Sequence, residues 1–334
     1  MKCTIQNIAD HLGLSRNTVS KALKNSSEVS ENTRNLVIKT ASKLGYKNAT
    51  FATPVIPASE TGSNGTILFL TRTYASDSEF WTTVLRGIES ILSNANYHLA
   101  ISIMSDSDLK QLNFPQTISD SSIKGIILVE ICDKVVCDAL SQFNLPIVSV
   151  DMPNVPFEEL NGIDVVTMES KKNLKKIINQ LIEKGAESFG FVGDLYSPNV
   201  SRGFQERYNA LSECLAEHQL PLNQKNCLLH QTPEDFRNFQ TTVNNLQAMI
   251  SLPDVFICGN DWTAIQLIYA LQFLGFQIPK DICVVGFDNI PAASRISPSL
   301  TTISTPQKYL GIAAARQILE RIQHPNCPHV FLSI

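Results

Sequence analysis

The sequence predicts an α/β protein in which a small helical head precedes a larger core of parallel sheets covered by helices. Residues 1–47 carry apolar residues at helical spacing in three short segments, and from Thr66 onward short apolar runs alternate with amphipathic helices. Such alternation is typical of doubly wound sheets, and the number of strands favours two sheets over one. The chain has 334 residues, 43 % of them apolar, which is enough for a small domain and a two-lobed larger one.

Residues 4–24 predict two short helices around a tight turn. The apolar face of the first helix consists of Ile5, Ile8, Ala9 and Leu12. Gly13 ends this helix because glycine readily adopts a positive φ, and Ser15 is a suitable N-cap for the second. The inner face of the second helix consists of Val19, Ala22 and Leu23.

The outer face of the second helix carries cations, an amide and a hydroxyl, and no carboxylate. Its members are Arg16, Asn17, Ser20, Lys21 and Lys24. Such a set can donate to phosphates and contact base edges in the major groove of DNA. The alternative is a surface helical hairpin with a solvated polar face.

A third helix follows a polar loop, with Ser30 as N-cap, Glu31 in its first turn and Gly45 at its end. Its inner face consists of Thr33, Val37, Ala41 and Leu44. Three short helices in this order predict a helix-turn-helix domain.

Charge is distributed unevenly along the chain. Residues 1–47 hold eight Lys/Arg and three Asp/Glu, a net charge of +5, whereas the remaining residues hold 19 and 28, a net charge of −9. A basic head on an acidic body predicts that only the head meets a polyanion.

The core alternates strands and helices. Strands are predicted over 66–70, 98–104, 125–129, 146–151, 163–168, 189–193, 254–259 and 282–288. Helices are predicted over 79–93, 133–143, 170–184, 202–219, 235–251, 262–274 and 309–322.

Several polar residues directly follow predicted strands, where doubly wound sheets bind ligands. They are Asp151, Asn260, Asp261 and Asp288. Carboxylate and amide groups accept hydrogen bonds from vicinal hydroxyls, so they favour a sugar or another polar ligand. The alternative for Asp261 and Asp288 is that each caps the next helix.

Neither catalysis nor a cofactor is predicted. The sequence contains no nucleophile–base pair, Walker loop or paired acid/base set. Its eight cysteines and six histidines are dispersed, which indicates buried free thiols and no metal site. No apolar run has the length of a membrane span or of a signal-peptide core, so a cytoplasmic protein is expected.

The whole of residues 4–47, TIQNIADHLGLSRNTVSKALKNSSEVSENTRNLVIKTASKLGYK, resembles the DNA-binding head of the lactose-repressor-like (LacI/GalR) family. The resemblance includes Ala9, Gly13, the TVS of the second helix, the VS-x-x-T-R segment and Leu-Gly-Tyr at 44–46. It implies DNA contacts from Thr4, Ser15, Arg16, Asn17, Thr18, Ser20, Lys21, Lys24, Asn25 and Tyr46.

Residues 48–64 form a linker that departs from the family pattern. Most members carry a hinge helix with an Ala-Arg-x-Leu core, whose Leu enters the minor groove. Here Thr53 follows Ala52 where Arg would stand, and Pro54 and Val55 take the last two places. The sequence therefore predicts an atypical hinge.

The rest of the chain, 65–334, resembles the two-lobed core of the same family, which is similar to type I periplasmic sugar-binding proteins. The matching segments are GFVGD (190–194), NDW (260–262), IPKDICVVGFDN (278–289) and PSLTTISTP (298–306). The resemblance places lobe one at 65–168 and 293–324, and lobe two at 169–292 and 325–334.

The resemblance also implies particular ligand contacts. The segment ERYNALSECL aligns Arg207 with the arginine that holds the ligand, although another register would favour Arg202. The alternative for Arg207 is a surface ion pair with Glu206 or Glu213. Phe80 and Trp81 stand where the family places an aromatic that stacks on a sugar, and the alternative is that they are core aromatics.

The resemblance thus implies a homodimeric transcriptional regulator, most simply a repressor, that binds a pseudo-palindromic operator and responds to a small effector between its lobes. A carbohydrate is the expected effector, and the protein is expected on the bacterial nucleoid when bound. The rival functions are a sugar-binding protein of the transport type and an enzyme on the same core.

Overall fold

The computed structural model describes residues 4–23, 29–30, 33–34, 36–37, 40–41, 63–72, 78–153, 155–195, 201–230 and 238–334. The chain divides into two compact units, residues 1–62 and 63–334, and we describe each by itself. Of the predicted linker, residues 48–64, the part that carries the atypical hinge lies in residues 48–62, outside the described residues.

The head begins with two helices that are capped as predicted. Helix α1 (Ile5–Leu12) begins at Thr4, whose hydroxyl accepts from the Asn7 amide, and ends at Gly13 with φ +64°. Helix α2 (Arg16–Leu23) begins after Ser15, whose Oγ accepts from the Thr18 amide at 3.0 Å. The turn between the helices is therefore set by one glycine and one serine.

A small apolar core joins these helices to a third helical segment. Residues 33–34, 36–37 and 40–41 are helical, and Ser30 Oγ accepts from the Thr33 amide. The buried residues of this core are Ile8, Ala9, Val19, Ala22, Val29, Val37 and Ala41. The apolar members of the predicted inner faces are thus confirmed at the described positions, whereas Thr33 is half-buried outside this core, and Leu44 and Gly45 lie outside the described residues.

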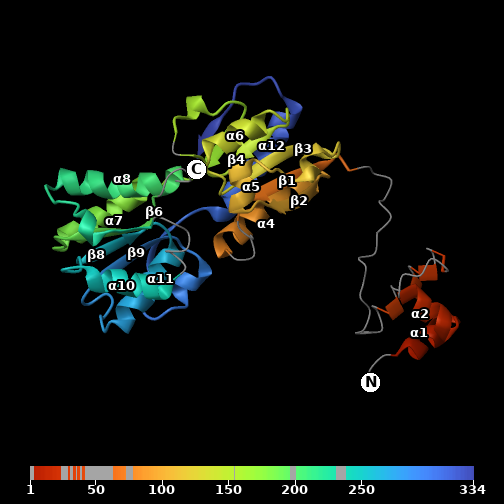
Figure 1. Cartoon of the computed structure of the whole chain (residues 1–334), viewed down its shortest axis with the longest axis horizontal. Coiled ribbons are helices and arrows are strands. Elements are labelled where there is room, and N and C mark those ends of the chain that lie inside the picture. The colour runs from red at the N-terminus through yellow and green to blue at the C-terminus, as the bar shows by residue number, and fades with distance from the viewer. Residues whose placement is uncertain are drawn as a thin grey trace. The chain divides into compact units, whose positions relative to one another are not determined.

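The first lobe of the body is a six-stranded parallel sheet in the order β11-β5-β4-β3-β1-β2 (Figure 1). Its strands are β1 (Thr66–Thr71), β2 (His98–Ile103), β3 (Ile123–Val129), β4 (Ile147–Ser149), β5 (Asp164–Thr167) and β11 (Phe331–Ser333). Its helices are α4 (Glu79–Asn94), α5 (Asp106–Gln111), α6 (Lys134–Ser141) and α12 (Gln307–Gln323).

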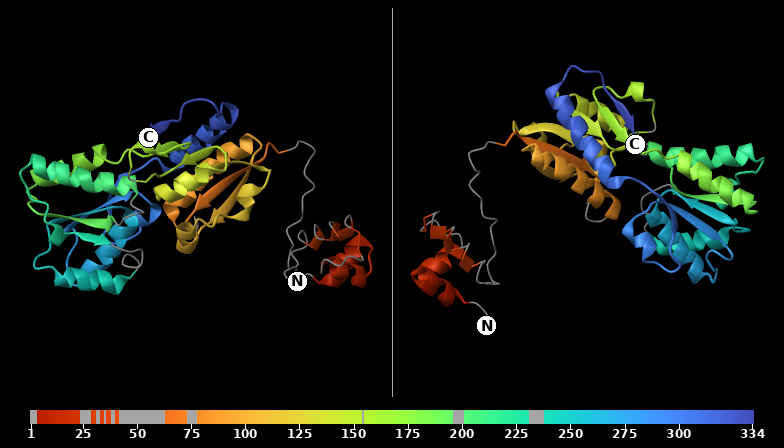
Figure 2. Two further views of the ribbon diagram at one scale, coloured as in Figure 1. Left: turned by 45° about the horizontal axis from the view of Figure 1, so that its top comes forward. Right: turned by 180° about the vertical axis from the view of Figure 1, so that it is seen from behind.

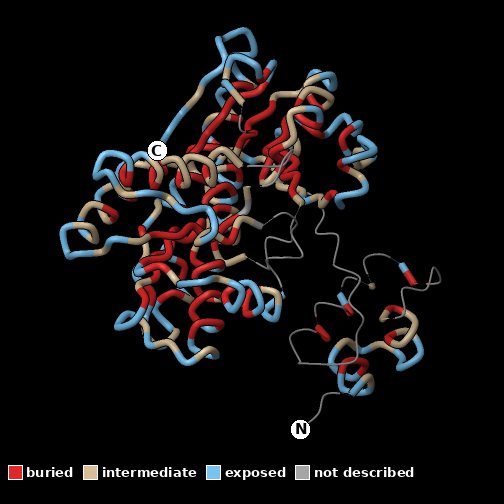
Figure 3. The backbone as a smooth tube through the Cα atoms, turned by 60° about the vertical axis from the view of Figure 1, so that its left-hand side comes forward, coloured by how far each residue is buried: buried red, intermediate tan, exposed pale blue. Residues whose placement is uncertain are grey.

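Alternate side chains along each strand of this sheet enter different cores. Ile67 and Phe69 of β1 pack with residues of α4 and α12, whereas Leu68 and Leu70 pack with residues of α5 and α6. Figure 2 shows α12 alongside α4 on one face of the sheet. Both faces are covered, which explains why the inner strands β1, β3, β4 and β5 are largely buried, whereas the edge strands β2 and β11 are partly exposed (Figure 3).

The second lobe is a five-stranded parallel sheet in the order β10-β9-β8-β6-β7. Its strands are β6 (Phe189–Asp194), β7 (Leu228–His230), β8 (Val255–Cys258), β9 (Cys283–Asp288) and β10 (Thr301–Ser304). Its helices are α7 (Lys172–Glu183), α8 (Arg202–Glu217), α10 (Phe239–Ala248) and α11 (Asp261–Phe273). Helices α7 and α8 cover one face, and α10 and α11 cover the other.

The strand pairing corrects two of the predicted lobe boundaries. Residues 293–304 were expected in the first lobe, but Thr301 pairs with Val285 of β9, so β10 belongs to the second sheet. The final segment, 325–334, was expected in the second lobe, but Phe331 pairs with Val165 of β5. Sequence similarity gave no pairing partner for either short strand, which is why both were misplaced.

The sequence reading also missed several short elements. These are α5, β7, β10 and the single 3₁₀ turns Gln116–Ser119, Phe157–Glu159, Gln224–Asn226 and Pro291–Ser294. None is long enough to show a full period of apolar residues. Within the described residues, no helix is both long and apolar enough to cross a membrane.

Candidate functional site

Polar side chains gather where the strands of the body end, as in other doubly wound sheets. In the first lobe Glu130 follows β3 and Asp151 follows β4, and in the second lobe Asn260 follows β8 while Asp288 ends β9. Arg207, on α8, lies against the ring of Phe287, next to Asp288, and Ser201 at the start of the same helix donates to Asp151, so Arg207, Asp151 and Asp288 form one cluster that draws on both lobes.

Arg207 lies at the centre of this cluster and is only 5 % exposed. Its Nη1 donates to the Gly259 carbonyl at 2.6 Å, and its guanidinium lies 3.8 Å from the centroid of the Phe287 ring. Its Nε is buried without a hydrogen-bond partner. The alternative of a surface ion pair therefore fails, and the Nε donor has no acceptor within the protein.

Glycine at position 259 makes this arrangement possible. A Cβ there would lie 2.2 Å from the Phe204 ring, which itself lies beside the Arg207 guanidinium. The backbone can therefore approach the arginine only because no side chain intervenes.

Two acids flank Arg207. Burial raises the pKa of Asp288 to about 8, although the charge of Arg207 acts to lower it. Burial likewise raises the pKa of Asp151 to about 6, against hydrogen bonding from Ser201 and the charge of Arg207. Asp288 also has φ +116°, which is unfavourable for a residue with a side chain, and its carbonyl accepts from Gln307 at 2.6 Å. Neither acid caps a helix, so the capping alternative fails for Asp288.

The structure separates the predicted pair Asn260 and Asp261. Asn260 is the N-cap of α11, because its Oδ1 accepts from the Thr263 amide at 2.9 Å, and its amide NH₂ remains as a donor. Asp261 is fully buried, and its oxygens accept from Thr302 Oγ1 and the Ile290 amide. Such engagement argues against ligand contact by Asp261 and gives it the role of tying α11 to the segments after β9.

The neighbouring aromatic residues Phe80 and Trp81 also differ in their surroundings. Phe80 is 8 % exposed and belongs to the apolar core, as the structural alternative had it. Trp81 is half-buried, packs edge-on against Phe80, and donates from Nε1 to Glu130 Oε1 at 2.6 Å. The indole is thus held in one orientation by a carboxylate at the end of β3.

Sequence reasoning missed Glu130. The signal was present, because Glu130 directly follows the buried strand β3, much as Asp151 stands just beyond the end of β4. It was overlooked because no family motif surrounds it.

The two lobes also touch beside this cluster. Ser201 Oγ donates to Asp151 Oδ2 at 2.6 Å, and the Arg202 amide donates to the Met152 carbonyl at 3.1 Å. The Arg202 side chain pairs with Glu206 and lies over the Phe331 ring. The alternative alignment would give the ligand-holding role to Arg202. Arg202, however, contacts the other lobe, whereas Arg207 is the cation at the centre of the cluster.

The predicted DNA-contact residues of the head fall into three groups. Ser15, Arg16 and Asn17 are exposed, and Thr18, Ser20 and Lys21 are half-buried on α2. Thr4 is exposed and caps α1. The remaining three, Lys24, Asn25 and Tyr46, lie outside the described residues.

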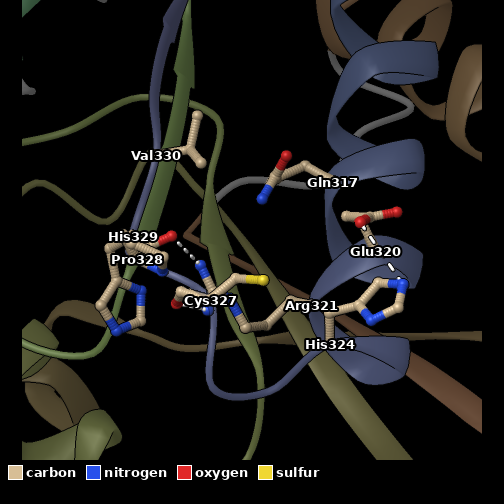
Figure 4. Close-up of a pocket in the computed structure, with 8 residues that line it drawn as sticks. All are labelled: Gln317, Glu320, Arg321, His324, Cys327, Pro328, His329 and Val330. Carbon is tan, nitrogen blue, oxygen red and sulfur yellow. Dashed lines mark hydrogen bonds and ion pairs between the residues drawn. The ribbon is translucent and has the colours of Figure 1, made fainter.

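A cavity of about 360 Å³ lies elsewhere in the body, between α12 and the segment before β11 (Figure 4). Its lining residues are Gln317, Glu320, Arg321, His324, Cys327, Pro328, His329 and Val330. Arg321 is directed from α12 toward this segment and donates to the carbonyls of Pro325, Cys327 and Pro328. These polar groups form hydrogen bonds with one another, so the contacts beside the cavity hold the segment before β11 against α12.

Neither a metal centre nor a disulfide occurs in the part of the chain that the structure describes. No three His, Cys, Asp or Glu side chains are grouped to ligate a metal there, and its seven cysteines are free thiols.

The chain matches known families in both of its units. Residues 4–48 match the model of the bacterial regulatory proteins of the lacI family, and residues 178–331 match that of the periplasmic binding protein-like domain. The ribose operon repressor of Haemophilus influenzae is 27 % identical over 97 % of this chain and 93 % of its own length.

Two solved structures share the fold. The complex of the transcriptional regulator CelR with cellobiose has a TM-score of 0.69 at 18 % identity, covering 100 % of this chain and 97 % of its own. The lac repressor dimer bound to operator has a TM-score of 0.65 at 18 % identity, covering 100 % of this chain and 96 % of its own. With a helix-turn-helix head joined to a two-sheet parallel core, and with both family models matched, this chain belongs to the LacI family of bacterial regulatory proteins.

Proposed function

We propose that this chain is a homodimeric transcriptional repressor whose hold on a pseudo-palindromic operator is controlled by a carbohydrate effector bound between its lobes. One observation carries the proposal. The body presents a buried and incompletely paired Arg207 between two acids, in the same chain as a helix that exposes Arg16 and Asn17.

The head supplies the DNA contacts in this proposal. Helix α2 enters the major groove, where Asn17 pairs with a base edge and Arg16 and Lys21 hold phosphate or guanine. Each subunit contacts one half-site. The ribose operon repressor and the lac repressor dimer on its operator, both similar to this chain, support this assignment.

The body supplies the effector site. Arg207 Nε and the Asn260 amide donate to ligand oxygens, and the carboxyl groups of Asp151 and Asp288 accept from ligand hydroxyls. Trp81 offers an oriented ring for the apolar face of a sugar. The complex of CelR with cellobiose, a structure that shares the fold of this chain, supports a carbohydrate as the effector.

Two arguments favour this function over its two rivals. A transport-type binding protein would have no use for a basic helix-turn-helix head, and an enzyme would need an acid/base or nucleophilic set. As a regulator of transcription the protein would act in the cytoplasm, on the nucleoid.

The test is titration of the full chain on a palindromic operator and on random DNA at several salt concentrations, with and without a panel of sugars. We expect a specific affinity on the order of 10³-fold or more above random DNA, and a shift on adding one sugar that corresponds to a coupling of about 1–3 kcal/mol. Equal affinity for operator and random DNA would refute the repressor, and no response to any sugar would refute the carbohydrate effector.

Within that experiment, two head variants separate base contact from phosphate contact. Asn17→Ala should lower the affinity for operator by about 1–3 kcal/mol while leaving random DNA unchanged. Lys24→Ala, predicted from the sequence to hold a phosphate, should weaken both complexes alike and reduce the salt slope by about 1.

A further inference from the structure

Only one of the two carboxylate oxygens of Glu130 accepts a hydrogen bond from the protein. Its Oε1 accepts from Trp81 Nε1 at 2.6 Å, whereas its Oε2 is buried and has no hydrogen-bond partner. Leaving a buried acceptor without a donor is unfavourable, because the oxygen has lost its hydrogen bonds to water and gained none from the protein. A donor that arrives with a ligand would remove this penalty.

The backbone at Glu130 adds a second observation. Its φ is +57°, in the left-handed region that a residue with a side chain adopts at some cost. This conformation turns the chain immediately after β3 and brings the carboxylate to Trp81, on the neighbouring helix α4. The strain thus accompanies a side chain that orients the aromatic ring of the cleft.

Charge in the cleft is unbalanced. The charges of Glu130 and Arg207 act on Asp151, and those of Asp151, Asp261 and Arg207 act on Asp288. Because the pKa of Asp288 is raised to about 8, this acid is largely neutral at pH 7, and the excess of acids over the central cation comes from Asp151, Asp261 and Glu130. Arg207 also forms no ion pair with any of the described acids. A phosphate or carboxylate on a ligand would meet several carboxyl groups and one partly engaged guanidinium, which is strongly unfavourable in a buried site.

We propose that Glu130 is a specificity-determining residue that makes the cleft select uncharged or amino-bearing sugars and reject phosphorylated and carboxylated ones. Its Oε1 fixes the indole of Trp81 as a stacking surface, and its Oε2 accepts a hydroxyl or ammonium hydrogen of the ligand. The inference rests on the proposed function, because it takes the effector to be a carbohydrate that binds in this cleft.

The test uses calorimetric titration of the full chain with matched sets of sugars at constant ionic strength. The sets are ribose with ribose 5-phosphate, and glucose with glucosamine, glucose 6-phosphate and glucuronate, together with cellobiose. We expect a neutral or amino sugar to bind, and the anionic member of its set to bind at least about tenfold more weakly.

Glu130→Gln supplies the decisive variant, because the amide oxygen can still accept from the Trp81 indole while the charge is lost. We expect weaker binding of the neutral sugar and a preference over its anionic counterpart reduced to about threefold or less. Glu158→Gln, which removes an exposed acid from the same lobe, is the matched control and should leave both affinities unchanged. Urea unfolding of each variant separates loss of binding from loss of folding.

The outcomes distinguish the two proposals. If an anionic sugar binds the natural protein as tightly as its neutral counterpart, or if Glu130→Gln keeps the full preference, this inference is overturned while the carbohydrate effector stands. If no sugar of any charge binds, both the inference and the carbohydrate effector are overturned.

Discussion

Replacing Arg321 by Met should destabilise the body severely, because it would leave Asp164 charged and fully buried. The Asp164 side chain is 0 % exposed, and Arg321 donates to it from Nε at 2.9 Å and from Nη2 at 2.8 Å. Gln317 Nε2 and the Val330 amide also donate to it, at 3.0 and 2.9 Å. Removing one partner of such a pair costs about 3–5 kcal/mol, a large fraction of the roughly 5–15 kcal/mol that stabilises a domain.

Replacing the other partner of this ion pair should destabilise the body less. Asp164→Asn leaves Arg321 buried, but the guanidinium keeps the carbonyls of Pro325, Cys327 and Pro328 as acceptors. We therefore expect a loss of about 1.5–3 kcal/mol, close to the value of hydrogen bonds to a charged group. The double variant Arg321→Met with Asp164→Leu should be more stable than Arg321→Met alone, because no buried charge remains.

The assay is urea unfolding followed by far-ultraviolet circular dichroism, with the m value compared between variants. Glu213→Gln, which breaks an exposed pair with Lys175 at 2.7 Å, is the control and should cost at most about 1 kcal/mol. Hydrogen bonds from Arg321 and Gln317 outweigh the opposing effect of burial and lower the pKa of Asp164, so the advantage of the natural protein should fade as the solution is acidified below about pH 4. An Arg321→Met variant no less stable than Glu213→Gln would refute the reasoning.

Two further predictions concern the cleft. Arg207→Met should weaken binding of the responding sugar by about 10–150-fold, which corresponds to charge-assisted hydrogen bonds of about 1.5–3 kcal/mol in total. Operator binding in the absence of sugar should persist. Arg202→Gln tests the alternative alignment and should change the affinity for the sugar little, as measured by calorimetry. Burial raises the pKa of Asp288 to about 8, above its value in the unfolded chain, so unfolding free energy should fall as pH rises from 6 to 8, by up to about 2 kcal/mol. Asp288→Asn should flatten that fall, and a slope unchanged by the substitution would assign it to another group.

The sequence predicted the two-sheet architecture because long buried strands leave an unmistakable pattern. The runs at 66–70 and 125–129 became the paired central strands β1 and β3, and each predicted helix covers a sheet face. Short strands were different. Thr301–Ser304 and Phe331–Ser333 owe their place to partners far away in the sequence, and no local period reveals which sheet they join.

The residues of the candidate site could likewise be predicted only in part. The rule that ligands bind at strand ends located Asp151, Asn260 and Asp288, and the alignment located Arg207. Neither the strand-end rule nor the family resemblance indicates which polar groups already have hydrogen-bond partners within the protein. Asp261 is adjacent to Asn260 in the sequence, yet only the three-dimensional contacts with Thr302 and Ile290 remove it from the site.

The contact between the lobes explains how an effector could change the geometry of this body. Within the described residues, the chain crosses between the two sheets only between β5 and α7 and between β10 and α12. Asp151, which belongs to the site, is also the group that accepts from Ser201 across the lobes. A hydroxyl that binds Asp151 must therefore either compete with Ser201 or share its carboxylate, and each choice changes the free energy of the lobe contact. Under the proposed function, occupancy of the effector site and the relative position of the lobes would therefore be linked through this carboxyl group, as control of a repressor by an effector requires.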